Sequence, residues 1–196
     1  MLDNLKKYRV ILGSNSPRRQ ELLKGIHVNF ELIPMDADES LPNHIQGLES
    51  ARYLAEKKAD AYTNILTEHD LLITADTIVL SENRILGKPH NKQEAVEMLR
   101  ALSGRIHQVV TGVCISTTTR RHSFHTITEV RFSNLTADEI DFYIDNYSPY
   151  DKAGSYGVQE WIGFIGVEHI NGSYFNVMGL PTHLVYQTLN DMANKS

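Results

Sequence analysis

The sequence predicts a mixed α/β fold with a twisted sheet, arranged in two lobes around a central cleft. Short apolar runs rich in β-branched residues alternate with segments of helical period, which is typical of sheets covered by helices. The chain has 196 residues, of which 41% are hydrophobic and 22% are charged, values that are ordinary for a folded domain. Because the sequence has no internal repeat, low-complexity tract or Gly/Ser linker, we expect a single domain over residues 1–196.

The elements expected in the first part of the chain follow hydrophobic periodicity and a helix-capping signal. Pro17 suits the first position of a helix because proline lacks the backbone N–H that is unpaired there, and Ser16 precedes it as the N-cap. Strands are expected at 8–12, 29–33 and 71–80, helices from Pro17 onward and over 48–62, and a loop over 35–46.

Capping signals and turn-forming residues predict the elements in the second part of the chain. Asn91 can cap a helix, and Thr136 with Glu139 forms a capping box that opens another helix. Residues 177–181 are expected to link a strand to a last helix that starts at Pro181. The remaining elements are a helix over 92–102, a hairpin of strands 105–116 and 122–132, a helix from 136 toward 146, a loop over 148–155 and a tight turn at 171–174.

Charge and cysteine content exclude several classes of protein. Lys and Arg number 19 against 24 Asp and Glu, so the net charge of −5 offers no broad electrostatic reason to bind nucleic acid. No apolar run approaches the ~18 residues of a membrane span, and the first residues lack a secretory signal. The single cysteine, Cys114, excludes an intrachain disulfide and fits a reducing compartment. We expect a cytoplasmic protein that binds neither nucleic acid nor membrane.

The segment from Gly13 to Arg19 lies between the first strand and the first helix. A helix N-terminus presents unpaired N–H groups and the positive end of a dipole, and Arg18 or Arg19 can add charge-assisted hydrogen bonds. This chemistry suits a phosphate group, although the spacing is not that of a P-loop. A capped surface helix with solvated arginines is the alternative.

Asp76 places an ionisable group inside the apolar run 71–80. Burial of a lone carboxylate costs several kcal/mol unless a cation or hydrogen-bond donors compensate it. A bound metal ion would resolve this conflict. The alternative is a carboxylate at a strand end or bulge that accepts hydrogen bonds from backbone N–H groups.

An acidic loop and several lysines add candidate ligands for a metal ion and for phosphate. Asp36, Asp38 and Glu39 offer the oxygen ligands that Mg²⁺ or Mn²⁺ prefers, although a solvated turn is the commoner reading of such a loop. Lys58 and Lys88 can neutralise phosphate oxygens as point charges. Lysines on exposed helices are usually only solubilising, and Gly87 and Pro89 make Lys88 the stronger candidate.

Residues 151–159 form a glycine-containing loop that ends in Gln159. The two glycines allow the backbone to approach a ligand closely, and an amide can partly match the acceptor–donor–acceptor edge of a uracil-like base. A structural turn is the alternative. The chain has no His-Glu-x-x-His zinc helix and no Gly-x-Ser-x-Gly nucleophile elbow, so serine or zinc hydrolase chemistry is unsupported.

Taken together and in this order, the motifs resemble the Maf family of nucleoside triphosphate pyrophosphatases over almost the whole chain. The matching motifs are SNSPRR at 14–19, ADTIV at 75–79, GKP at 87–89, LSG at 102–104, VVTG at 109–112, DKAG at 151–154, YGVQ at 156–159, NGSY at 171–174 and GLP at 179–181. The resemblance implies a Maf-like fold similar to that of the inosine triphosphate pyrophosphatases. It also implies hydrolysis of a nucleoside triphosphate to the monophosphate and pyrophosphate.

The form of the 154–159 motif resembles the branch of the family that acts on dTTP and UTP, with modified uridine triphosphates as a further option. By this resemblance Asp76 matches the catalytic acidic residue. The same resemblance implies that Arg18, Thr77 and Gln159 match the specificity positions of the family. It also implies that the phosphate or metal contacts are made by Ser14, Glu39, Lys58 and Lys88.

The resemblance also implies a divalent cation, Mg²⁺ or Mn²⁺, held by Asp76 and Glu39. Asp36 and Asp38 compete with Glu39 for this role, and Lys57 competes with Lys58. The expected partners are pyrimidine nucleoside triphosphates; a homodimer is one option, and the oligomeric state is left open. The alternative function is a nucleotide-binding regulator of septum formation that needs no catalysis.

Overall fold

The computed structural model describes residues 2–42, 44–82 and 84–194. The chain forms two compact units. Unit 1 comprises Met1–Asp76, Thr111–Thr126 and Gly179–Ser196, and unit 2 comprises Thr77–Val110 and Ile127–Met178. The single domain over 1–196 stays a prediction, and each unit is described by itself.

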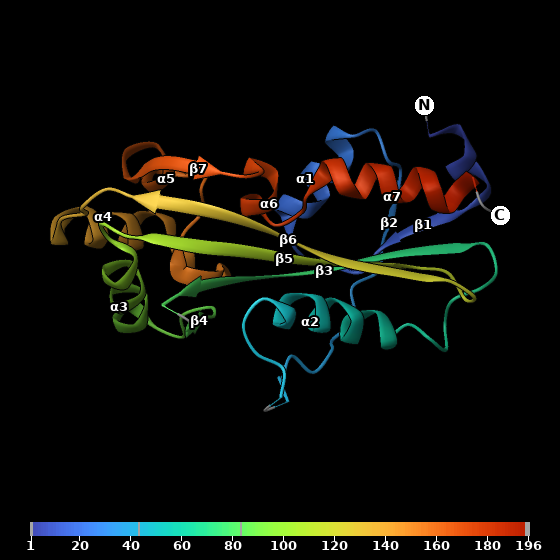
Figure 1. Ribbon diagram of the computed structural model, residues 1–196, viewed down its shortest axis with the longest axis horizontal. Helices are drawn as coiled ribbons and strands as arrows, with labels where there is room; N and C mark the ends of the chain where they lie inside the picture. Colours follow the sequence, from blue (N-terminus) through green and yellow to red (C-terminus); the bar gives the residue numbers. More distant parts are fainter. Residues whose placement is uncertain (1, 43, 83, 195–196) are drawn as a thin grey trace. The chain divides into compact units, whose positions relative to one another are not determined.

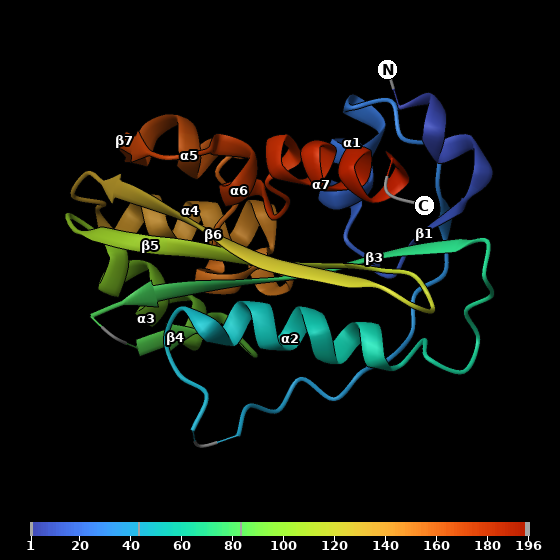
Figure 2. The ribbon, with the colours of Figure 1, turned by 45° about the vertical axis from the view of Figure 1, so that its right-hand side comes forward.

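Unit 1 has helices on both faces of its part of the sheet. Strand β1 pairs in parallel with β2 and with the beginning of β3, for example Val10 opposite Leu71. Helix α2 covers one face, and α1 and α7 cover the other (Figures 1 and 2). The elements are the 3₁₀ helix η1 Asp3–Lys7, β1 Arg9–Leu12, α1 Pro17–Gly25, β2 Glu31–Leu32, α2 Glu49–Asp60 and α7 Thr182–Asn194, together with residues 70–76 of β3 Asp70–Ser81.

Unit 2 is mainly antiparallel in its strand pairing. Strand β4 pairs antiparallel with the end of β3, and β7 pairs antiparallel with β6. Two further strands run through both units: β5 Ile106–Ser116 has residues 106–110 in unit 2, and β6 Arg121–Phe132 has residues 127–132 there. The other elements of unit 2 are β4 Arg84–Leu86, α3 Lys92–Leu102, α4 Ala137–Tyr147, η2 Pro149–Asp151, η3 Ala153–Ser155, α5 Trp161–Gly166, β7 Val167–Asn171 and α6 Tyr174–Met178. The strand order β2-β1-β3-β5-β6-β7, with parallel and antiparallel pairs, confirms the mixed α/β fold class.

The long elements and their caps agree with the sequence predictions. Ser16 Oγ accepts a hydrogen bond from Arg19 N at 3.5 Å, and Asn91 Oδ1 accepts one from Glu94 N at 3.0 Å. The capping box of Thr136 and Glu139 is present at the start of α4. Each side chain accepts from a backbone N–H that the helix itself leaves unpaired.

The short elements differ from the predictions. Residues 177–181 begin in the last two residues of helix α6 and do not follow a strand, so that prediction was wrong. Helix α7 begins at Thr182, one residue after Pro181. Helix α5 and strands β4 and β7 were not predicted. Elements of three to six residues complete too few periods for a hydrophobic pattern to show. No helix in the described part of the chain combines the length and the apolar character that a membrane span requires.

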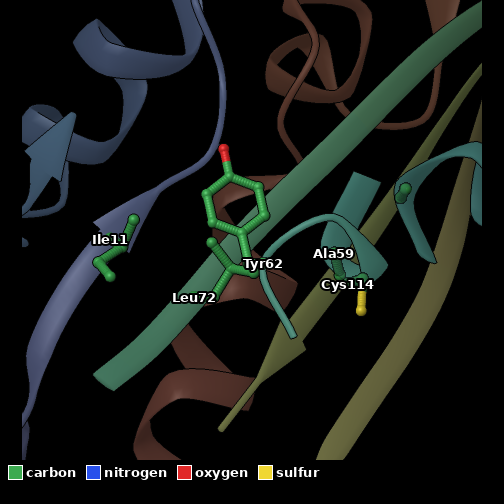
Figure 3. Close-up of a cluster of buried hydrophobic side chains, with 6 residues drawn as sticks. Ile11, Ala59, Tyr62, Leu72 and Cys114 are labelled. Carbon is green, nitrogen blue, oxygen red and sulfur yellow. The ribbon is translucent and has the colours of Figure 1, made fainter. Parts of the chain in front are cut away.

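A buried cluster joins helix α2 to the strands of unit 1. Its members are Ile11, Ala55, Ala59, Tyr62, Leu72 and Cys114, several of which are shown in Figure 3. The two alanines leave room for the helix backbone to approach the sheet. Tyr62 buries its ring in the cluster, and its hydroxyl donates a hydrogen bond to Ile33 O at 2.5 Å, so the polar group has a partner.

Two contacts fix the distance between α2 and the sheet. A Cβ atom added to Gly112 of β5 would lie 2.1 Å from Ala51 O, so only glycine fits under the helix there. Thr74 Oγ1 of β3 donates a hydrogen bond to Ala55 O at 2.7 Å, although both groups are buried. The next turn of the helix carries Lys58, which is thereby held beside β3.

Candidate active site

The turn between β1 and α1 lies tightly against β3. Gly13 N donates to Ile73 O at 2.9 Å, which continues the pairing of the two strands by one residue. A Cβ atom on Gly13 would lie 2.9 Å from Thr74 Cγ2 and 2.8 Å from the Tyr62 hydroxyl. Absence of a side chain at this position therefore brings the following residue, Ser14, close to the middle of β3.

Ser14 and Arg19 form the core of this turn. Ser14 Oγ accepts hydrogen bonds from Ser16 N at 3.3 Å and from Arg19 Nη1 at 3.2 Å. Arg19 Nε donates to Gly179 O at 2.8 Å, so the guanidinium is anchored at both ends. Arg19 therefore orders the turn. Which of Arg18 and Arg19 contacts a bound phosphate stays a prediction.

Several charges act on the Arg19 guanidinium. Burial lowers its pKa, and the positive charge of Arg18 lowers it further, whereas the carboxylates of Asp76 and Glu39 raise it. Arg18 itself lies in the first turn of α1 and is partly buried. Two arginines and two carboxylates of unit 1 therefore share one electrostatic environment around the turn.

Lys58 joins the two acidic residues that the sequence nominated. Its Nζ lies 2.5 Å from Asp76 Oδ1 and 2.9 Å from Glu39 Oε1. The Lys58 and Asp76 side chains are only 17% and 13% exposed, whereas that of Glu39 is 49% exposed. Because both buried members are charged, each depends on the other for compensation.

The structure gives the neighbouring residues Lys57 and Lys58, and Asp38 and Glu39, different partners. Lys57 contacts Asp38 Oδ2 at 2.7 Å and Ser40 O at 3.1 Å, away from Asp76. Lys57 and the Ser40 groups hold the pKa of the Asp38 carboxyl well below its usual range. Adjacent lysines on α2 thus contact different carboxylates: Lys57 contacts Asp38, and Lys58 contacts both Glu39 and Asp76.

Asp76 lies within β3, well inside its ends, and a lysine compensates its charge. The strand-end alternative, in which backbone N–H groups satisfy the carboxylate, does not describe this arrangement. Thr77 follows it in the strand, so the two side chains point to opposite faces.

The pair Glu39 and Asp76 fits a divalent cation by its donor chemistry. In the described residues, no place brings three or more His, Cys, Asp or Glu side chains together as a metal-binding group. Mg²⁺, however, is usually bound by one or two carboxylates together with substrate phosphates and water. Two carboxylates that already converge on one ammonium group match that coordination.

Unit 2 carries the remaining nominated residues, Thr77, Lys88 and Gln159. Lys88 is exposed and follows β4, and the carbonyl of its neighbour Gly87 accepts a hydrogen bond from Gly154 N at 3.0 Å. Gln159 precedes α5. Its Oε1 atom is buried and finds no hydrogen-bond partner among the described residues, which leaves an acceptor available for a ligand.

Sequence reasoning missed the ionic network that surrounds this segment. Lys152 Nζ lies 2.7 Å from Asp151 Oδ1 and 3.1 Å from Glu160 Oε1, although the Lys152 side chain is only 8% exposed. Glu160 Oε2 accepts a hydrogen bond from the Tyr143 hydroxyl. The DKAG motif marked the lysine, but nothing in the sequence showed that it is buried.

Comparisons with known proteins bear on the whole chain. The protein-family model described as "Maf-like protein" matches residues 9–192. A protein of Bacteroides fragilis named dTTP/UTP pyrophosphatase is 53% identical over 193 residues, which cover 98% of this chain and 100% of that protein. A protein of the same name from Porphyromonas gingivalis is 51% identical over 100% of this chain and 100% of its own length. Another from Flavobacterium johnsoniae is 45% identical over 97% of this chain and 98% of its own length.

A solved structure is similar in fold. The Staphylococcus aureus Ham1 protein aligns over 92% of this chain and 99% of its own, with a TM-score of 0.51 and 15% sequence identity. At this identity the likeness concerns the fold alone, and it agrees with the mixed α/β class.

Proposed function

The chain belongs to the Maf family, and on that premise we propose that it hydrolyses dTTP and UTP to the monophosphate and pyrophosphate. The names of its relatives support this substrate class. The observation that carries the proposal is the convergence of Lys58, Asp76 and Glu39, in the same unit as the Ser14–Arg19 turn. Hydrolysis of a triphosphate requires cations and hydrogen-bond donors that bind the phosphates, and a carboxylate that accepts a proton from the attacking water. Unit 1 supplies all of these groups.

Asp76 is the proposed catalytic residue. Its carboxylate would orient a water molecule for attack on the α-phosphorus and accept the proton that the water loses. The bond between the α-phosphorus and the bridging oxygen then breaks, and pyrophosphate leaves. Lys58, Arg18 and Lys88 would stabilise the negative charge on the phosphate oxygens, and Ser14 would donate a hydrogen bond, because phosphoryl transfer depends mainly on positioning and electrostatics.

Glu39 and Asp76 would hold Mg²⁺ or Mn²⁺ through their carboxylate oxygens. When bound, the cation supplies charge screening of the triphosphate and a lower pKa for a coordinated water. The Lys58 ammonium contacts both carboxylates in the structure. When a cation takes that position, the ammonium group would contact the phosphate oxygens.

Gln159 and Thr77 would distinguish the base. The Oε1 atom of Gln159, which is buried and has no hydrogen-bond partner in the residues that the structure describes, supports this role. An amide that pairs with a uracil-like edge is left unsatisfied by a mismatched base. We also propose that the chain acts as one domain over 1–196. The cytoplasm is its proposed location, for which the lone buried thiol of Cys114 is consistent support.

Pyrophosphate release from a panel of nucleoside triphosphates, with Mg²⁺ or Mn²⁺, tests the proposal. UTP and dTTP are expected to be hydrolysed much faster than ATP, GTP or CTP, and Asp76→Asn is expected to abolish release while circular dichroism shows an intact fold. Equal rates on all nucleotides would refute the specificity, and an active Asp76→Asn protein would refute the mechanism. A protein that binds UTP without turnover would instead favour a regulatory role.

A further inference from the structure

A largely buried ionic network lies directly beside Gln159 in unit 2. Glu160 is its centre: Oε1 contacts Lys152 Nζ at 3.1 Å, and Oε2 accepts the hydrogen bond of the Tyr143 hydroxyl. The Glu160 side chain is 20% exposed, and Tyr143 is fully buried. Burial and the neighbouring Glu160 carboxylate raise the pKa of Tyr143, so its proton stays in place as a donor.

The network holds the backbone on the N-terminal side of Gln159. Gly157 N donates to the Tyr143 hydroxyl at 3.0 Å, and Glu160 N donates to Gly157 O at 3.0 Å. A Cβ atom on Gly157 would lie 2.8 Å from Glu160 Cδ, so the glutamate side chain folds back over this glycine. One tyrosine oxygen therefore links the Glu160 carboxylate to the Gly157 backbone.

The C-terminal side of Gln159 is held as closely. Gly163 N in α5 donates to Glu160 O at 2.9 Å, and a Cβ atom on Gly163 would lie 1.9 Å from Val158 O. Both chain neighbours of Gln159 are therefore held in place. Val158 packs against α5, and Glu160 contacts Lys152 and Tyr143. Within the described part of the chain, the buried amide oxygen of Gln159 has no hydrogen-bond partner that would set its direction.

We propose that Glu160 is a positioning residue, which holds the 157–160 turn through Lys152 and Tyr143 so that the Gln159 amide meets the pyrimidine base. The inference rests on the proposed function, since it assigns the amide a base to read. The negative charge matters because Lys152 is almost buried and Asp151, its other partner, is 56% exposed and less able to compensate it. Precise placement of a polar group is what separates a matched from a mismatched base.

The variant Glu160→Gln preserves the shape of the side chain and removes its charge. We expect the KM for UTP to rise about 10-fold, equivalent to about 1.4 kcal/mol, with kcat little changed, and the preference for UTP over CTP to fall. Tyr143→Phe, which breaks the link to Gly157 by another route, should act in the same direction. Glu168→Gln is the matched control, because Glu168 makes an exposed ion pair with Arg131 at 3.0 Å, and its KM should be unchanged.

A double-mutant cycle separates positioning from a general structural effect. In a Gln159→Ala background, Glu160→Gln should leave the UTP to CTP preference unaltered, because there is no amide left to position. Amide hydrogen exchange measured by NMR, without nucleotide, should show faster exchange at Gly157 in Glu160→Gln and unchanged exchange in the control.

Each result has one meaning. Unchanged KM and unchanged Gly157 exchange in Glu160→Gln would overturn the inference, as would an equal effect of the variant with and without Gln159. If the wild-type protein shows no preference for UTP and dTTP, the proposed function fails, whereas the exchange measurement still reports whether Glu160 holds the turn.

Discussion

Lys58 Nζ lies 2.5 Å from Asp76 Oδ1, so the nearly buried acid of β3 is compensated by a lysine from the helix packed over the same strand. Two features of the chain produce this pairing. Gly112 lets α2 approach the sheet, and Thr74 bonds the helix backbone two residues before Asp76. The site therefore depends on packing contacts that take no part in its chemistry.

Replacement of Lys58 is expected to be far more damaging than replacement of its neighbour. Lys58→Met should lower pyrophosphate release from UTP by about 100-fold or more, because it removes a cation from a charge-dependent site. Lys57→Met, which loses the contacts with Asp38 and Ser40, should stay within a few-fold of wild type. Steady-state kinetics on both purified variants provide the comparison, and equal losses would argue against the distinct role of Lys58.

Glu39 is expected to set the requirement for a divalent cation. Glu39→Gln can still accept a hydrogen bond from Lys58 but lacks a charged ligand, so the Mn²⁺ concentration for half-maximal rate should rise about 10-fold. Asp38→Asn should not alter it, because Asp38 is engaged by Lys57. Titration of Mn²⁺ into chelator-treated protein measures both, and a larger shift in Asp38→Asn would reverse the assignment.

Gly112→Ala should destabilise unit 1. The new Cβ would lie 2.1 Å from Ala51 O and 2.4 Å from Arg52 N, both backbone atoms, so α2 must shift. We expect the free energy of unfolding to fall by about 3 kcal/mol. Urea denaturation measures it, with Gly25→Ala as control. Apart from the chain neighbours and the α1 backbone, no atom of the described residues lies within 4 Å of a Cβ there, so the expected change is about 1 kcal/mol or less. Matching stabilities would contradict the close packing.

His107 should make stability depend on pH. Its Nε2 is hydrogen-bonded with the Tyr156 hydroxyl at 2.7 Å, and burial lowers the pKa of His107 from 6.5 to about 4. Between these values the unfolded chain binds a proton that the folded protein does not, so stability falls as pH falls through this window, by up to about 3 kcal/mol. Above pH 6.5 the ring is neutral in both states and the effect vanishes.

The comparison protein for this prediction is His107→Gln. Its free energy of unfolding should change less between pH 7 and pH 4.5 than that of wild type, whatever its absolute stability. Parallel pH profiles of the two proteins would show that His107 does not contribute.

The sequence predicted two kinds of feature: contacts between residues close together in the chain, and patterns that extend over many residues. The caps at Ser16, Asn91 and Thr136 were confirmed because each is a contact between residues three apart. Asp76 stood out because it interrupts a long apolar strand. The Maf resemblance was confirmed because it depends on the order and spacing of many motifs over nearly the whole chain.

Choices between neighbours could not be made in this way. Lys57 and Lys58, or Asp38 and Glu39, carry the same charge in the same local pattern. Successive residues of a helix point in directions about 100° apart, so only the docking of α2 on β3 determines which lysine meets Asp76. Short elements such as α6 contain too few residues for a periodic pattern to predict them, so tertiary packing contributes to their formation.

The sequence by itself therefore determined the fold class, the family, the main helices and strands, and the types of residue available to a triphosphate and its cation. Tertiary structure alone decided which of those residues meet, and it revealed Lys152, Tyr143 and Glu160 around Gln159. The physical reason is that residue type and periodicity are local properties, whereas burial and pairing of charge arise only when segments distant in the chain pack together.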